Sequence, residues 1–145
     1  MNSIRRALVA AFVLTLVRPL AALAAWNKEA FSAKTAGDAL KSLGIGNPQP
    51  SKDLTVEVPE IAENGAVVPI EISSTIPGTT ALIVVIDKNP FPLITRFDFK
   101  EGALPFVKLN AKVGETSDVR VLAEAAGKYY VTTREVKVTI GGCGG

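Results

Sequence analysis

Ala81-Leu82-Ile83-Val84-Val85-Ile86 is an uninterrupted run of six apolar residues near the middle of the chain. The turn sequence Pro77-Gly78 precedes the run, and a loop sequence with two prolines, residues 87–92, follows it. A short apolar run bounded by turn signals is typical of a strand that is buried on both faces. The run therefore predicts a strand with other parts of the protein packed against each side of it.

Shorter stretches on either side of this run alternate between apolar and polar residues, which is the pattern of strands with one buried face. Asn64-Gly65 and Ala126-Gly127-Lys128 are turn signals between them, and Asn-Gly is the pair that most readily adopts positive φ. Pro69 argues that its strand is an edge strand or contains a bulge. The predicted strands are residues 54–58, 67–72, 81–86, 93–99, 106–113, 118–125, 129–133 and 135–140. About seven to eight short strands with this turn spacing predict an all-β antiparallel β-sandwich.

Residues 27–43 have a helical pattern and predict a short N-terminal helix. Thr35 is a candidate N-cap with Asp38 three residues later, and Gly44 is a candidate C-terminal stop. Residues 44–51 have the composition of a turn. We expect the helix to pack across one end or one face of the sheets.

Residues 1–24 have the three parts of a secretory signal peptide. Arg5 and Arg6 form the charged part, residues 7–17 are apolar, and Ala22-Leu23-Ala24 is a small-x-small cleavage site. The apolar part is too short to cross a bilayer core. The sequence therefore predicts cleavage after Ala24 and a periplasmic protein, and the paired arginines leave the twin-arginine export route open.

The remaining chain is long enough for one domain with a sizeable core. The predicted organisation is a signal peptide at 1–24, an N-terminal helix and linker at 25–52, a β-sandwich at 53–140, and a C-terminal arm at 141–145. The formal net charge of +2 becomes −1 once the three arginines of residues 1–24 are removed. A nearly neutral domain has no electrostatic footprint for nucleic acid or for an anionic membrane.

The composition also argues against an enzyme. The chain contains no histidine and one cysteine, so a zinc or copper site and a Cys–His catalytic pair are not expected. It contains no Walker, dinucleotide-binding or Gly-x-Ser-x-Gly motif. We therefore expect a non-catalytic protein without a metal or another cofactor.

The single cysteine lies in the last five residues, Gly141-Gly142-Cys143-Gly144-Gly145. Glycine has no Cβ and visits positive φ freely, so these four glycines predict a mobile tether that cannot bury the thiol. Fully extended, five residues reach roughly 17 Å, which is enough to present the sulfur to a pocket of another protein. Two other interpretations stay open: a terminus with an incidental cysteine, and an intermolecular Cys143–Cys143 disulfide.

Three motifs together resemble the SoxY family, the sulfur-carrier subunits of the bacterial sulfur-oxidation (Sox) system. The first is Gly-Gly-Cys-Gly-Gly directly after the strand ending at Ile140. The others are the stretch from Pro59 to Pro69 and the loop Lys88-Asn89-Pro90-Phe91-Pro92. The likeness covers about residues 36–145. The family's usual twin-arginine motif is only loosely matched here.

The resemblance implies an immunoglobulin-like sandwich that forms a heterodimer with SoxZ. It also implies that thiosulfate-derived sulfur is held covalently on the thiol of Cys143. Gly141, Gly142, Gly144 and Gly145 match the family's swinging arm. The transient partners that it implies are the haem enzyme SoxAX, which joins thiosulfate to the cysteine, SoxB, which hydrolyses off sulfate, and the sulfane dehydrogenase.

Two rival functions use the same tail differently. Small β proteins that end in Gly-Gly can carry sulfur as a thiocarboxylate, which would place the sulfur on Gly145, but those proteins work in the cytoplasm with an activating enzyme. An exported structural β-sandwich that dimerises through a Cys143 disulfide is the other alternative. It would form disulfide dimers and would never carry a sulfur adduct that depends on turnover.

Overall fold

The computed structural model describes residues 26–139, so the predicted signal peptide and the arm at 141–145 lie outside the described residues. Within this range the chain forms two short helices and nine strands in two sheets. The elements are α2 (Lys28–Ser32), α3 (Ala36–Ser42), β1 (Gln49–Pro50), β2 (Leu54–Glu57), β3 (Ile61–Ala62), β4 (Val68–Ser74), β5 (Thr79–Ile86), β6 (Leu93–Asp98), β7 (Phe106–Ala111), β8 (Ser117–Ala125) and β9 (Lys128–Val138). α2 and α3 have five and seven residues, and nothing helical in residues 26–139 could cross a membrane.

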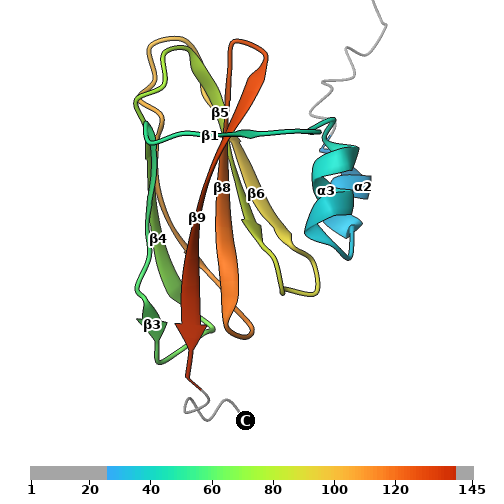
Figure 1. Ribbon diagram of the computed structural model, residues 1–145, viewed down its shortest axis with the longest axis vertical. Coiled ribbons are helices and arrows are strands. Elements are labelled where there is room, and N and C mark those ends of the chain that lie inside the picture. Colours follow the sequence, from blue (N-terminus) through green and yellow to red (C-terminus); the bar gives the residue numbers. More distant parts are fainter. Residues whose placement is uncertain (1–25, 140–145) are drawn as a thin grey trace, which may run out of the picture.

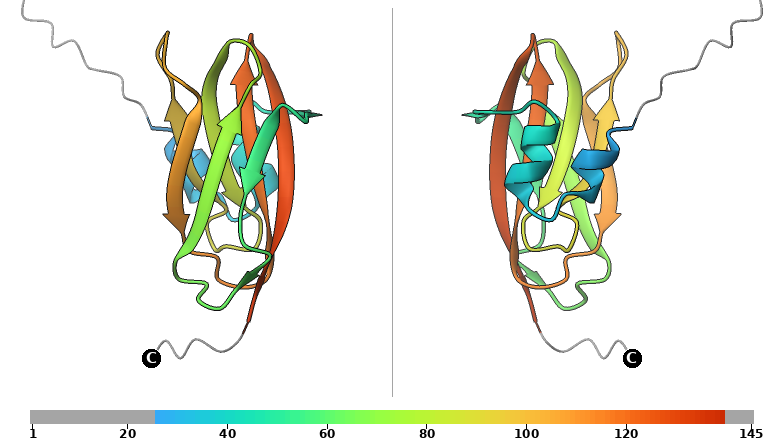
Figure 2. Two further views of the ribbon diagram at one scale, coloured as in Figure 1. Left: turned by 90° about the vertical axis from the view of Figure 1, so that its left-hand side faces the viewer. Right: turned by 90° about the vertical axis from the view of Figure 1, so that its right-hand side faces the viewer.

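The strands form the predicted all-β sandwich, with the helices as a third layer (Figure 1). The larger sheet has the order β1-β9-β8-β5-β6, with β3 also paired to β9, and the smaller sheet has the order β2-β4-β7. Figure 2 shows the smaller sheet on one side of the molecule and the helices on the opposite side. The longer strands pair with antiparallel neighbours, whereas the two-residue strands β1 and β3 run parallel to β9.

β5 is buried on both faces, as its apolar run predicts. Leu82, Val84 and Ile86 belong to the core between the two sheets. Ile83 and Val85 point the other way and pack in a second cluster with residues of the helices. Because successive side chains of a strand point to opposite faces, an uninterrupted apolar run is required where both faces are covered.

The N-terminal segment forms two helices, so the prediction of one helix over residues 27–43 is wrong in that respect. Thr35 is the N-cap of the second helix, as predicted, and its side chain accepts a hydrogen bond from Asp38 N–H at 3.1 Å. An N-cap residue has extended backbone, here φ −127° and ψ 150°, so a helix cannot run through it. Asn27 caps α2 and also donates a hydrogen bond to the carbonyl of Ser42 at 2.7 Å, which joins the two helices.

β9 is a single strand of eleven residues and includes both of the strands predicted for residues 129–140, up to Val138. The predicted hairpin before it is confirmed: Ala126 and Gly127 have φ values of 50° and 72° and connect β8 to β9. Sequence patterns did not indicate β1 or β3, because two-residue strands are too short to show alternation. Residues 44–51 were predicted only as a turn, but two of them, Gln49 and Pro50, pair with β9 in the larger sheet.

Pro69 lies in the central strand of the smaller sheet, which contradicts the prediction of an edge strand or a bulge. Pro69 pairs with Asn110 of β7 on one side. On the other side, the pairing of β4 with β2 ends at Glu57 and Glu71, before Pro69 is reached. Proline lacks an N–H donor and is tolerated here because, in the described chain, no neighbouring strand pairs with that side of the residue.

An ion-pair network holds the edge strand β6 against β8. Arg96 of β6 contacts Asp98 at 2.8 Å and reaches across β5 to Glu124 of β8 at 2.7 Å. Burial opposes the charged form of Arg96, but the hydrogen bonds and charges of the two carboxylates outweigh it and raise the pKa of Arg96 above its usual value. The guanidinium therefore stays charged at any pH at which the protein is folded.

Candidate functional site

The cysteine identified in the sequence follows β9, so the end of β9 is where the segment that contains it begins. β9 ends beside β3, at the end of the sandwich that also holds the loops after β5 and β7 (Figures 1 and 2). We call this region the tail-root site and define it as residues 60–65, 87–92, 112–116 and 137–139. Cys143 comes four residues after Thr139, and it and the four glycines of the arm lie outside the described residues.

The last residues of β9 are held from both sides. On the β3 side, Lys137 N–H donates to the Glu60 carbonyl at 2.9 Å and Thr139 N–H donates to the Ala62 carbonyl at 3.2 Å. On the other side, Val138 N–H donates to the Thr116 hydroxyl oxygen at 3.0 Å. Every N–H of this three-residue end is therefore bonded, so the anchored part of the chain extends to Thr139.

Gly65 allows two parts of the tail-root site to approach closely. Val113 N–H donates to the Gly65 carbonyl at 2.7 Å. A Cβ on Gly65 would overlap the carbonyl oxygen of Val113 and would lie 2.9 Å from Val138 Cγ1. The positive φ expected for the Asn64-Gly65 turn is not found, so the glycine is needed for space rather than for a left-handed backbone.

Asn89 connects the loop after β5 to the loop after β7. Its side-chain amide donates to the Lys112 carbonyl at 2.7 Å, and its side-chain oxygen accepts from Gly114 N–H at 3.0 Å. The same loop is fixed by an ion pair between Asp87 and Arg120 of β8. The Nζ atom of Lys34, in the segment between the two helices, lies 3.7 Å from the centre of the Phe91 ring. This cation–π contact connects the helical layer to the loop.

The contacts in the tail-root site position the start of the tail. No group of three or more His, Cys, Asp or Glu side chains that could bind a metal occurs among residues 26–139. Lys137, the base nearest to the tail in sequence, has a side chain that is 65% exposed and lies 3.9 Å from Glu135. The site therefore holds the start of the tail in place.

The geometry defines a class of protein: an all-β sandwich whose last strand is anchored up to the point where a glycine-rich tail with one cysteine begins. The family model of "Sulfur oxidation protein SoxY" matches residues 41–143, and the chain belongs to this family. The solved structure of the sulfur carrier protein SoxY from Chlorobium limicola f thiosulfatophilum is 37% identical, with a TM-score of 0.67. The match covers 75% of this chain and 100% of that one.

A second solved structure, from work on T cell activation by the bacterial superantigen toxic shock syndrome toxin-1, is 13% identical. It has a TM-score of 0.43 and covers 59% of this chain and 99% of that one, which is too distant to support any argument. None of the curated proteins matches this chain.

Family membership confirms the resemblance that the terminal and internal motifs indicated. The roles predicted for Cys143, Gly141, Gly142, Gly144 and Gly145 remain predictions. Sequence reasoning also treated the loops around Asn64 and Asn89 as turns, and it did not identify Thr116 at all. The bonds at Glu60 and Ala62 use backbone atoms, and a single threonine carries no pattern, so no sequence signal pointed to them.

Proposed function

We propose that this protein is a sulfur carrier that holds thiosulfate-derived intermediates covalently on the thiol of Cys143. The four glycines serve as the arm that moves the sulfur between partner enzymes, and the sandwich itself is not catalytic. The proposal is supported by membership of a sulfur oxidation family together with the hydrogen bonds that fix β9 up to Thr139. A short arm on a fixed base gives the thiol a limited reach, which suits repeated delivery to docked partners.

The proposed cycle balances in atoms and electrons. The thiol and thiosulfate join through a new S–S bond and release one proton and two electrons, which the haem partner SoxAX accepts. Water then hydrolyses the terminal sulfonate in SoxB, which releases sulfate and leaves a persulfide on Cys143. The sulfane dehydrogenase then oxidises the outer sulfur of the persulfide to a sulfonate, with three water molecules as the oxygen source and six electrons passed to that enzyme's electron acceptor. A second hydrolysis in SoxB releases sulfate and restores the thiol of Cys143. In each step the reactive groups other than the thiol belong to the partner, because the sequence neighbours of Cys143 are glycines, which carry no charge that could activate it.

The proposed setting is the periplasm, where the protein acts as a heterodimer with SoxZ. The proposal for export depends on residues 1–24, in which Arg5, Arg6 and the Ala22-Leu23-Ala24 cleavage site form a signal peptide. Export would place the carrier in the periplasm together with the proposed partners. A thiol there is also open to oxidation, so a Cys143–Cys143 disulfide dimer is the expected resting side product.

Replacing the sulfur atom tests the carrier proposal directly. We expect Cys143→Ser to abolish thiosulfate-dependent growth of cells that have no second copy of the gene, because a hydroxyl does not form a persulfide. The variant should keep the wild-type free energy of unfolding to within about 0.5 kcal/mol, because the residue follows the last strand. Normal growth of a folded Cys143→Ser strain would contradict the proposal and favour a structural sandwich.

A further inference from the structure

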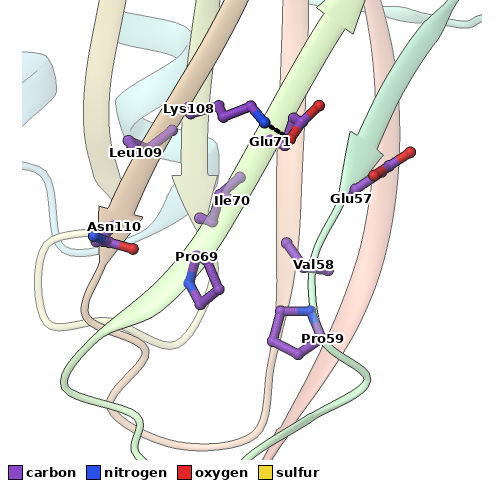
Figure 3. A pocket seen from close by; sticks show the side chains of 9 residues that line it. All are labelled: Glu57, Val58, Pro59, Pro69, Ile70, Glu71, Lys108, Leu109 and Asn110. Atoms are coloured by element: carbon purple, nitrogen blue, oxygen red, sulfur yellow. Dashed lines mark ion pairs between the residues drawn. The ribbon is translucent and has the colours of Figure 1, made fainter.

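The pairing of β2 with β4 stops just before two prolines that would face each other. The last pair is Glu57 with Glu71, and two residues further on the same register would pair Pro59 with Pro69. Figure 3 shows the two proline rings on opposite sides of a groove of about 600 Å³. The two chains therefore separate where a pair of prolines would be the next hydrogen-bonding step.

The backbone polar groups of Pro69 point toward β2. In an antiparallel ladder, successive residues of a strand direct these groups alternately to its two neighbours. Ser74 N–H donates to the Pro105 carbonyl at 3.0 Å, which continues the register of β4 with β7. Thr75 N–H donates to the Asp53 carbonyl at 2.8 Å, which continues the register with β2. Odd-numbered residues of β4 therefore bond toward β2, and Pro69 is one of them.

A pair of Pro59 and Pro69 could form no hydrogen bond. Such a pair normally has two N–H···O=C bonds, one in each direction. Proline has no N–H, so each of the two residues removes one of these bonds. The ladder therefore ends one step earlier, at Glu57 and Glu71.

This early end leaves enough chain to cross to the larger sheet. The Glu60 carbonyl accepts a hydrogen bond from Lys137 N–H at 2.9 Å, close to the end of β9. Packed sheets lie about 10 Å apart, and three extended residues span about 10 Å. The three steps from Glu57 to Glu60 therefore just cover the distance. A ladder that included Pro59 would leave one step for the crossing, so it and the bond from Lys137 exclude each other.

We propose that Pro59 and Pro69 are positioning residues for the C-terminal tail. Because they block the ladder of the smaller sheet, the segment that follows pairs with β9 instead, where the carbonyls of Glu60 and Ala62 hold the end of the strand. The tail therefore starts from a strand end that is bonded on both sides. The inference rests on the proposed function only for the use of the tail, because the competition between the two pairings concerns the sandwich alone.

Restoring the missing N–H groups tests the proposal. The variants are Pro59→Val, Pro69→Val and the double variant, in the processed chain of residues 25–145. One net hydrogen bond changes an equilibrium by about fivefold, and two change it by about 25-fold. We therefore expect the amides of Lys137 and Thr139, which bond to the segment after Pro59, to exchange hydrogen about fivefold faster in each single variant and about 25-fold faster in the double variant.

Two other amides serve as internal controls. Val138 N–H donates to the Thr116 hydroxyl oxygen on the other side of β9, so it should not accelerate with its two neighbours. Val121 lies within β8 and is fully buried, so it reports any change in global stability, and all rates are compared with its rate. Pro77→Val, in the exposed turn before β5, is the matched control for the loss of a proline and should leave these relative rates unchanged.

Two results would overturn the inference. One is an equal acceleration, or none, of all three amides from Lys137 to Thr139 relative to Val121. The other is a double variant that exchanges no faster than the single variants, because each restored N–H adds a bond to the same ladder.

The starting point of the tail gives a second readout. Nitroxide labels on Cys143 and on Lys128→Cys, at the other end of β9, give a distribution of distances by double electron–electron resonance. Release of Thr139 from Ala62 moves the fixed base of the tail back to Val138, which extends the reach of the thiol from about 14 Å to about 17 Å. The distribution should therefore be wider in the double proline variant. A distribution as narrow as that of wild type would contradict the positioning role.

This inference and the carrier proposal can fail separately. The exchange and distance measurements use the protein without a sulfur adduct and without a partner enzyme. Unchanged exchange in the proline variants would still leave the growth defect expected for Cys143→Ser. Normal growth of the Cys143→Ser strain would leave the competition between the two pairings intact.

Discussion

At Gly65 the main chain passes so close to the end of β9 that any side chain would collide with it. The carbonyl of Gly65 is bonded to Val113 N–H, and a Cβ would press on Val113 and Val138. This residue therefore holds the loop before β4 against the segment after β7, close to the side chain of Val138 in the strand that leads to the tail. Asn64-Gly65 was recognisable in the sequence as a turn. The contacts of Gly65 with Val113 and Val138 were not, because these residues lie almost 50 and more than 70 positions further along the chain and no local pattern encodes such contacts.

We expect Gly65→Ala to lower the free energy of unfolding by about 1–3 kcal/mol, because overpacking forces backbone shifts where no flexible side chain can yield. Urea unfolding measures the loss. Gly46→Ala is the matched control, since a Cβ at Gly46 has no neighbour within 4 Å and its φ is not positive. That variant should lie within about 0.5 kcal/mol of wild type. Equal stability of the two variants would show that the loop can move away without cost.

Among the elements, the pair α2 and α3 shows how a capping residue divides a helical pattern. Thr35 and Asp38 were identified in the sequence as a capping pair, and the structure places Thr35 between two helices rather than within one. Apolar residues of α2 and α3 share a cluster with Ile83 and Val85 of β5, so the double burial of the 81–86 run depends on this pair of short helices. Periodicity indicated that residues 27–43 are helical, but it does not fix where the backbone breaks.

Loss of the cap should loosen α3 on the sheet. We expect Thr35→Ala to reduce the free energy of unfolding by about 1 kcal/mol, because the N–H of Asp38 loses its acceptor. Thr35→Ser keeps an oxygen at the same position and should retain most of the stability. The measurement is again urea unfolding. A Ser variant as unstable as the Ala variant would show that packing of the methyl group matters more than the cap.

The end of β9 is the second element with a testable role, because it sets the starting point of the tail. Thr116→Val removes the acceptor of Val138 N–H without changing the size of the side chain. One hydrogen bond contributes about 1 kcal/mol, so hydrogen exchange of the Val138 amide should become about fivefold faster. Thr133→Val, an exposed position of the same strand, is the control. Unchanged exchange at Val138 in Thr116→Val would mean that β3 alone anchors the strand.

At the scale of the whole molecule, the sequence predicted the class of fold and the structure adds its arrangement. Alternation and turn spacing identified seven of the nine strands of the described chain, because a half-buried strand of four or more residues shows its period. The two-residue parallel strands β1 and β3 are too short to show this period. The end of β2 at Glu57 lies one residue from its predicted end at Val58, because Pro59 stops the strand.

The intact mass of the protein shows whether Cys143 carries sulfur during turnover, as we propose. The protein is purified from the periplasm of cells supplied with thiosulfate and weighed before and after treatment with a reductant. We expect added sulfur or sulfonate groups that the reductant removes and that digestion places in the peptide containing residues 141–145. A bare thiol, or only a disulfide homodimer, in cells that are oxidising thiosulfate would contradict it.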